Sequence, residues 1–302
     1  MLTFDQYLTP KSLDEAFDML HSIPAARLLA GATDLLPWAR EGRAGDVHLP
    51  AIVDLSRIAS LSGVTQTGGR IRMGATTPIA AMQHHPLLQQ QAPLLGDCAL
   101  WFADDQIREQ ATVGGNLVNA SPAGDTQPAL LALNTHVTLV RREAGRLIER
   151  SVPLSEFILG PSRTVLQPGE ILLRIEFDAL PDHGVSFEKV GHRRSLAIST
   201  VCLATLVRLD AHQRIDDLRI AIGAVGPVPE RLSDIEDLLT GFKPTPASLR
   251  DASAKVADRV RSRSRQSYRR EVLSNFVERS LATALAHAGL DLHRLPKETP
   301  YV

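Results

Sequence analysis

Glycine and small polar side chains are concentrated between residues 111 and 125, which read ATVGGNLVNASPAGD. The adjacent Gly114 and Gly115 can adopt backbone conformations closed to other residues, and they can approach a ligand without an intervening Cβ. Successive N–H groups exposed in such a turn form a concave site for an anion. Side-chain donors and acceptors for hydroxyl or amide groups are added by Asn116, Asn119, Ser121 and Asp125. An apolar run follows at once, so the segment predicts a binding loop rather than a linker.

A second glycine turn lies upstream at residues 28–35, LLAGATDL. An apolar run ends at Ala30, Gly31 opens the turn, and Thr33 and Asp34 can cap a following helix. A strand, a glycine turn and a helix start in this order place backbone N–H groups and the positive end of a helix dipole near one anion. The same order is equally typical of an ordinary strand-to-helix turn. Two such loops in one chain suit a ligand with two phosphates, held between subdomains. Neither G-x-G-x-x-G nor G-x-x-x-x-G-K-[ST] occurs, which excludes the common dinucleotide and P-loop sites.

The composition excludes several classes of function. The 302 residues carry 33 Lys and Arg against 34 Asp and Glu, so there is no basic excess for binding nucleic acid. Only Cys98 and Cys202 are present, which is too few for an iron–sulfur cluster and favours buried thiols in a reducing compartment. Neither H-E-x-x-H nor G-x-S-x-G occurs. No apolar run reaches the roughly 18 residues of a membrane span, so we expect a cytoplasmic protein.

Hydrophobic periodicity predicts three parts. Residues 1–57 predict a β–α–β–α–β unit, and residues 58–178 predict a second subdomain of strands and helices. After a boundary at residues 181–184, residues 182–302 predict a three-stranded antiparallel sheet covered by helices. Ser12 and Glu15 form a predicted capping box, and Thr77-Pro78 predicts a helix start. The predicted strands lie near residues 4–8, 27–30, 51–55, 63–75 (a hairpin), 137–141, 146–151, 169–173, 185–190, 197–209 and 218–225, and the last helices near 232–239, 246–260 and 268–287.

Three motifs together resemble the FAD-binding subunit of the molybdenum hydroxylases, the family of the carbon monoxide dehydrogenase medium subunit and of the flavin domain of xanthine dehydrogenase. They are LLAGATDL, ATVGGNLVNASPAGD, and FEKVGHRR with AIST at residues 187–194 and 197–200. The likeness runs in the family's order from Phe4 to about His287. It implies an α+β fold, with a two-subdomain FAD-binding domain of the vanillyl-alcohol-oxidase (PCMH) type and a C-terminal domain of the carbon monoxide dehydrogenase type. The first loop departs from the family pattern, because Ala32 stands where a second glycine is usual.

The resemblance also implies which residues contact FAD. Both glycine loops would hold the diphosphate, Asp125 would bond a hydroxyl or amide of FAD, and Leu172 and Lys189 would border its flavin or adenine end. From the sequence alone, Lys189 fits a surface lysine better, and Phe102 fits either the core or a flavin contact. Neither glycine loop holds a His, Cys or Tyr, so we expect non-covalent FAD. The expected cofactor-binding residues are Leu28, Leu29, Ala30, Gly31, Ala32, Thr33, Asp34, Leu35, Phe102, Thr112, Val113, Gly114, Gly115, Asn116, Asp125, Leu172 and Lys189.

Partner subunits follow from the same resemblance. In the family, substrate is hydroxylated at a molybdopterin cofactor on a large subunit. Electrons pass through 2Fe-2S clusters of a small subunit to FAD, and then to an external acceptor. The resemblance therefore implies a dimer of heterotrimers, with no catalytic acid or base on this chain. The basic run at residues 261–265 is more typical of a solvated loop, and a subunit contact is the alternative. This run and the apolar face of the last helix are the candidate contact surfaces. Two alternatives stay open: a stand-alone FAD-dependent oxidoreductase of the same superfamily, and a scaffold that binds no flavin.

Overall fold

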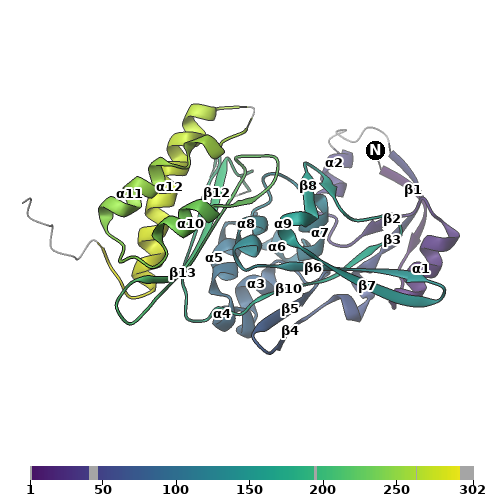
Figure 1. The fold of residues 1–302 in the computed structure, drawn as a ribbon. Coiled ribbons are helices and arrows are strands. Elements are labelled where there is room, and N and C mark those ends of the chain that lie inside the picture. The colour runs from purple at the N-terminus through teal and green to yellow at the C-terminus, as the bar shows by residue number, and fades with distance from the viewer. Residues whose placement is uncertain (1, 41–46, 194–195, 263, 293–302) are drawn as a thin grey trace, which may run out of the picture.

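The computed structural model describes residues 2–40, 47–193, 196–262 and 264–292. Figure 1 shows an elongated molecule, with the N-terminal unit at one end and the C-terminal helices at the other. The N-terminal unit contains β1 (Leu2–Leu8), α1 (Leu13–Ser22), β2 (Arg27–Leu29), α2 (Leu35–Arg40) and β3 (Val47–Asp54). Its strands form a parallel sheet in the order β1-β3-β2, which confirms the predicted β–α–β–α–β unit.

The start of α1 corrects one sequence prediction. The Ser12 hydroxyl accepts a hydrogen bond from the backbone N–H of Glu15 at 3.2 Å, as a capping box requires. The Glu15 carboxylate, however, accepts from the N–H of Lys11 at 2.7 Å instead of returning to Ser12. The N-cap is therefore present, but the reciprocal half of the predicted capping box is wrong.

The second part is built on an antiparallel sheet in the order β4-β5-β10-β6-β7. Its strands are β4 (Val64–Thr67), β5 (Arg70–Gly74), β6 (His136–Glu143), β7 (Arg146–Pro153) and β10 (Ile171–Asp178). Between β5 and β6 lie α3 (Ala80–His84), α4 (Pro86–Gln91), α5 (Pro93–Trp101), α6 (Asp105–Gln110), α7 (Val113–Asn119) and α8 (Thr126–Ala132). After β7 come α9 (Leu154–Phe157) and the hairpin of β8 (Ile158–Gly160) and β9 (Arg163–Thr164). The helix start predicted at Pro78 is wrong, because Pro78 forms an isolated bridge with Thr112 and α3 begins two residues later.

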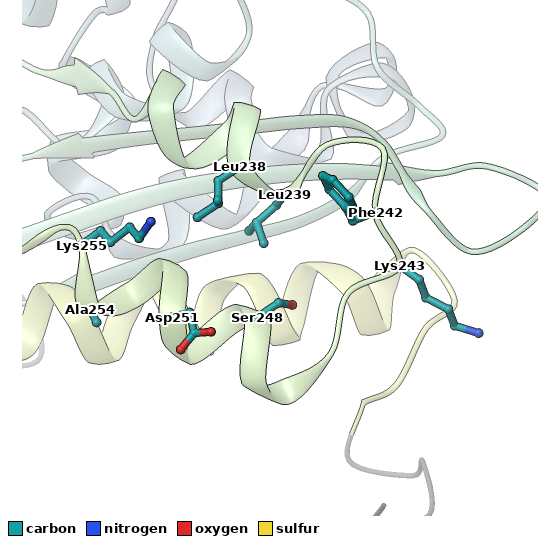
Figure 2. A pocket seen from close by; sticks show the side chains of 8 residues that line it. All are labelled: Leu238, Leu239, Phe242, Lys243, Ser248, Asp251, Ala254 and Lys255. Atoms are coloured by element: carbon teal, nitrogen blue, oxygen red, sulfur yellow. The ribbon is translucent and has the colours of Figure 1, made fainter.

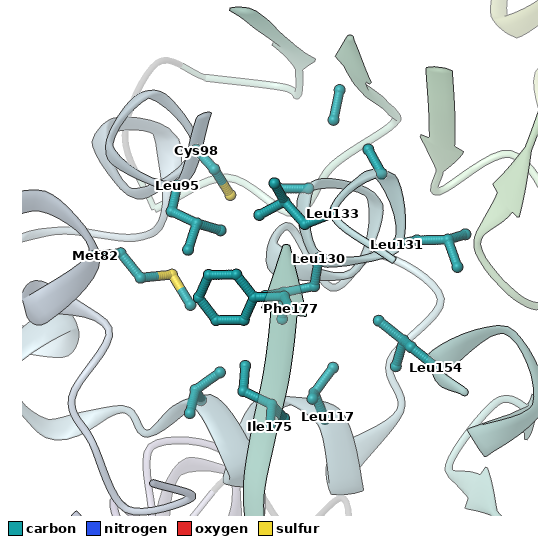
Figure 3. Close-up of a cluster of buried hydrophobic side chains, with 14 of the residues drawn as sticks. Met82, Leu95, Cys98, Leu117, Leu130, Leu131, Leu133, Leu154, Ile175 and Phe177 are labelled. Carbon is teal, nitrogen blue, oxygen red and sulfur yellow. The ribbon is translucent and has the colours of Figure 1, made fainter. Parts of the chain in front are cut away.

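A large apolar core joins these helices to the sheet. Phe177 of β10 lies at its centre in Figure 3, with Met82 and Leu95 on one side and Leu130 of α8 close by. These side chains are completely buried. The core therefore fixes α5, α7 and α8 against one sheet, and with them the second glycine segment, which begins just before α7 and ends at the start of α8.

The C-terminal part has a four-stranded antiparallel sheet rather than the predicted three strands. Its elements are β11 (Gly184–Val190), β12 (Val201–Leu209), β13 (Ile215–Gly223), β14 (Glu230–Arg231), α10 (Ser233–Leu239), α11 (Pro246–Ala254) and α12 (Gln266–His287). The additional strand, β14, is two residues long, which is too short to show any periodicity in the sequence. The predicted domain reaches residue 302, and residues 293–302 lie outside the described part of the chain.

Both faces of this sheet are covered. Along β12, Val201, Leu203 and Val207 pack with α10–α12, whereas Cys202, Ala204 and Leu206 belong to the same core as α5 and α8. The two predicted domains thus share a hydrophobic core. The apolar face of α12 packs against β11 and β12, so the prediction that this face contacts a partner is wrong. Within the described residues, no helix combines the length and apolar character needed to span a bilayer.

Candidate functional site

The two predicted glycine segments line one cleft of about 700 Å³. This volume lies within the range of small-molecule and cofactor sites. The cleft lies where the N-terminal unit, the helices α5–α8 and the segment between β11 and β12 meet. The predicted residues that line it are Leu28, Leu29, Ala30, Gly31, Ala32, Thr33, Asp34, Leu35, Phe102, Thr112, Gly115, Asn116 and Asp125.

Four predicted residues are buried without lining the cleft: Val113, Gly114, Leu172 and Lys189. Leu172 belongs to β10 and packs in the central core. Asn119 and Ser121, which the sequence suggested as donors and acceptors for a ligand, line the cleft as well. The cleft is also lined by residues that were not predicted, namely Arg27, Ala103, Ile107, Ala111, Val118, Ala123, Gly124, Ser162, Leu196, Ala197 and Ile198. Ser162 lies in the β8–β9 turn and carries no motif signal.

The first glycine loop presents backbone donors. None of the hydrogen bonds within the described residues engages the N–H groups of Gly31, Ala32 or Thr33. Ala32 adopts a left-handed conformation with φ of 56°, which a second glycine would adopt without strain. Because these residues line the cleft, their N–H groups are available to an anionic ligand, as predicted for this loop.

This loop rests directly on the second glycine segment. A Cβ on Gly31 would lie 2.0 Å from the carbonyl oxygen of Gln110, so only glycine permits this contact between the two backbones. The side chain of Asn119 donates a hydrogen bond of 2.9 Å to the Asp34 carboxylate, which joins the loops a second time. The two segments therefore form one unit.

The second glycine segment differs from its prediction. Gly114 and Gly115 lie in the first turn of α7, and neither has a positive φ. The N–H of Val113 donates to Thr77 O at 3.1 Å and that of Gly114 to Ala75 O at 2.8 Å. The N–H of Gly115 donates to the hydroxyl of Thr112 at 3.2 Å. The prediction that the glycine pair exposes successive N–H groups to an anion is therefore wrong.

These two glycines have steric roles instead. A Cβ on Gly114 would lie 2.7 Å from the side chain of Ala75, so this glycine lets α7 pack closely on the segment after β5. Gly115 lines the cleft, and a Cβ there would lie 2.7 Å from the hydroxyl oxygen of Thr112, so this glycine lets Thr112 cap α7. Next to it, Asn116 accepts a hydrogen bond of 2.6 Å from the Thr126 hydroxyl at Oδ1. This bond orients the amide, so Nδ2 is the Asn116 group available as a donor to a ligand.

A buried ion pair lies at the cleft wall. Asp125 Oδ2 accepts a hydrogen bond of 2.6 Å from Lys189 Nζ, and Oδ1 accepts one of 2.5 Å from the Ser199 hydroxyl. Burial raises the pKa of Asp125, while the Lys189 ammonium and the Ser199 hydroxyl act in the opposite direction. The side chain of Lys189 is 4% exposed, so the surface position favoured by sequence alone is wrong. A direct bond from Asp125 to FAD stays a prediction.

A second hollow of about 670 Å³ lies between α10 and α11 (Figure 2). Its lining combines apolar and charged side chains, and no residue predicted to bind the cofactor belongs to it. The lining residues are Leu238, Leu239, Phe242, Lys243, Ser248, Asp251, Ala254 and Lys255. The glycine-loop cleft, which gathers the predicted residues, is therefore the candidate site.

The residues of the cleft fit FAD. The N–H groups of the first loop suit a diphosphate, and the Asn116 amide suits a polar ring or ribose group. Phe102, Ile107 and Val118 supply apolar surface for the rings. The small parallel unit encloses this cleft together with α6, α7 and the loops beside them, which pack on the antiparallel sheet, and this defines a two-part nucleotide-binding flavoprotein fold.

Comparisons with known proteins place the chain in a family. Residues 2–179 match the FAD binding domain in molybdopterin dehydrogenase, and residues 186–284 match the CO dehydrogenase flavoprotein C-terminal domain. Over 299 residues, the chain is 29% identical to the xanthine dehydrogenase FAD-binding subunit of Escherichia coli O157:H7, covering 96% of this chain and 99% of that protein. It is also 29% identical over 290 residues to the carbon monoxide dehydrogenase medium chain of Hydrogenophaga pseudoflava, covering 94% of this chain and 98% of the other.

Solved structures agree with the sequence comparisons. Carbon monoxide dehydrogenase from Hydrogenophaga pseudoflava, in a form that lacks the Mo-pyranopterin moiety of its cofactor, aligns with a TM-score of 0.85 at 27% identity. This alignment covers 93% of the present chain and 97% of the matched chain. The chain therefore belongs to the family of FAD-binding subunits of molybdenum-containing dehydrogenases.

Proposed function

We propose that this chain is the electron-transfer subunit of a three-subunit molybdenum hydroxylase. It binds FAD non-covalently in the glycine-loop cleft, receives electrons from 2Fe-2S clusters of a small partner subunit, and passes them to an external acceptor. The observation that carries this proposal is that both glycine segments line one cleft, in which the first loop has backbone donors with no acceptor among the described residues. Bound FAD supplies the redox chemistry.

The residues of this chain bind and orient the cofactor. The N–H groups of Gly31, Ala32 and Thr33 bind the diphosphate without any charged side chain. Asn116 donates its amide to the cofactor, and Phe102 excludes water from one side of the cleft. Because electrons rather than substrate reach this subunit, the site needs no general acid or base. Substrate choice lies with another subunit, and the two relatives described above are named for xanthine and carbon monoxide.

The partners in this proposal are a small 2Fe-2S subunit and a large molybdopterin-binding subunit, in a dimer of heterotrimers. The given sequence contains two cysteines, too few to hold a 2Fe-2S cluster, so in this proposal the clusters lie on a partner subunit. Of the basic segment expected to contact a partner, Arg261 pairs with Glu230 at 3.2 Å, and Arg265 contacts His192 at 3.3 Å. Arg263 lies outside the described residues. Within the described residues Arg265 has no carboxylate partner, and it is our candidate contact in this segment.

Two experiments test the proposal. The purified chain should show flavin absorbance, and acid precipitation should release all of the flavin into the supernatant. A colourless protein that takes up no added FAD would support the scaffold alternative. A yellow pellet would contradict non-covalent binding.

Co-expression of this chain with its two partner subunits should allow affinity capture of all three on a tag carried by this chain. The captured complex should reduce an artificial electron acceptor with substrate, whereas the isolated chain should not. Turnover of a substrate by the isolated chain, without retention of the partners, would support the stand-alone alternative.

A further inference from the structure

One buried ion pair joins three segments that line the cleft. Asp125 ends the Ser121–Asp125 loop, which itself lines the cleft. Lys189 lies on β11 in the C-terminal part, and its ammonium donates both to Asp125 and, at 2.9 Å, to the backbone carbonyl of Trp101. Trp101 directly precedes Phe102 and Ala103, which form another wall. Ser199, which donates to the other oxygen of Asp125, directly follows the wall formed by residues 196–198.

We infer that Asp125 and Lys189 are positioning residues, which hold the walls of the cleft in place. Both oxygens of the carboxylate are engaged by groups from the C-terminal part of the chain. Lys189 is buried behind the cleft and does not line it. Because the pair is buried and both of its members are hydrogen-bonded within the protein, water competes with these bonds far less than it does at a surface contact. The three walls of the cleft, formed by residues 102–103, 121–125 and 196–198, are therefore held in fixed positions relative to one another.

This arrangement couples the C-terminal part to the cofactor site. The segment at residues 196–200 has no strand or helix of its own and precedes β12. Ile198 is 73% exposed, so burial of its side chain does not anchor the segment. The segment is held by the bond of the buried Ser199 hydroxyl to Asp125, and by hydrogen bonds from the guanidinium groups of Arg193 to Leu196 O and of Arg269 to Thr200 O. The Ser199 bond is the one of these that ties it to the Ser121–Asp125 loop. The identity of the ligand as FAD rests on the proposed function, whereas the anchoring of the walls does not.

Hydrogen exchange of the flavin-free chain tests the inference directly. In Ser199→Ala, the backbone N–H of Thr200, which donates to Val190 O at 2.7 Å directly after the lost anchor, should exchange at least about tenfold faster, the scale of one lost hydrogen bond to a charged group. Amides of residues 102–103 should be unchanged in this variant. In Lys189→Met, the amides of residues 102–103 should exchange faster, because the bond to the Trp101 carbonyl is lost. Ser199→Thr keeps the hydroxyl and should restore slow exchange.

Ser280→Ala is the matched control. Its hydroxyl is buried in the same part of the chain and donates to Thr205 at 2.8 Å, within the core. This variant should leave exchange at Thr200 and at residues 102–103 unchanged. The FAD dissociation constant, measured in parallel, should rise about tenfold in Ser199→Ala and stay constant in the control.

The measurements separate positioning from direct cofactor binding. The inference would be overturned if Ser199→Ala and Lys189→Met bound FAD more weakly while amide hydrogen exchange at Thr200 and in the cleft wall at residues 102–103 stayed unchanged. Unchanged exchange and unchanged binding would overturn it as well. If the wild-type chain takes up no FAD but the walls still loosen as described, the proposed function fails and the inference stands. Should Lys189→Met fail to fold, Ser199→Ala and its Thr rescue decide the question.

Discussion

Replacing Gly31 with alanine should damage the cleft more than any other single methyl group added to its glycines. The new Cβ would lie 2.0 Å from the carbonyl oxygen of Gln110, 2.8 Å from its carbonyl carbon and 3.0 Å from the Cα of Ala111. All three neighbours are backbone atoms, so no side-chain rotation can relieve the overlap. The first loop must therefore move away from the second segment. Overpacking of this kind costs about 1–3 kcal/mol.

Urea unfolding of the flavin-free Gly31→Ala chain should show this loss as a lower midpoint. The same shift should misplace the N–H groups of the first loop, so FAD titration should show affinity weakened about tenfold or more, since 1.4 kcal/mol is a factor of ten. Gly69→Ala is the control, because a Cβ there has no neighbour within 4 Å and the residue lies in a hairpin turn. Wild-type stability and full FAD occupancy in Gly31→Ala would refute the contact between the two backbones.

Three further variants test other parts of the structure. Gly115→Val should fold yet retain little FAD in an absorbance assay, because the branched side chain enters the cleft that Gly115 lines; full occupancy would contradict this placement. Ala32→Gly should stabilise the flavin-free chain by up to about 1 kcal/mol in urea, because a left-handed alanine is strained; a loss of stability would argue against the φ of 56°. Hydrogen bonds from His183 and Arg219 lower the pKa of the Asp217 carboxyl group. The ionised carboxylate therefore stabilises the folded chain at pH values above the ordinary carboxylate pKa of about 4, and this stabilisation is lost as the pH falls below that value. Asp217→Asn should therefore lower the unfolding temperature at pH 7 and lose less stability than wild type on acidification; parallel pH curves for both proteins would contradict this.

Local periodicity was sufficient to predict most of the fold. The β–α–β–α–β unit, the hairpin of β4 and β5, and the strands β6, β7, β10, β11 and β13 all follow from short apolar runs separated by turn residues. The starts and ends were less accurate, as at Pro78, where a residue suited to the first helical turn is used in a bridge instead. For β12, both faces are buried, so its continuous apolar run gave no indication of which residues meet which helices.

The lining of the cleft was only partly predictable. The glycine motifs identified the loops, because close backbone approach requires residues without a Cβ. Ser162 and residues 196–198 reach the cleft only through tertiary packing, and nothing in their local sequence indicates a site. Lys189 was misplaced for a related reason. Its partner, Asp125, is 64 residues away in sequence, and only that partner makes burial of an ammonium favourable.

The two glycine loops have different physical roles, although their sequences suggested the same one. In the second segment, glycine serves packing, and its N–H groups are used within the protein. In the first loop, the N–H groups of Gly31, Ala32 and Thr33 have no acceptor within the described residues, yet the left-handed residue is an alanine. Its conformation is therefore not a consequence of glycine's freedom. The close contact of Gly31 with Gln110 and the bond between Asp34 and Asn119 hold the loop on both sides of this alanine. If the loop binds an anion as we propose, the second segment supports that binding indirectly, because it holds the loop in place.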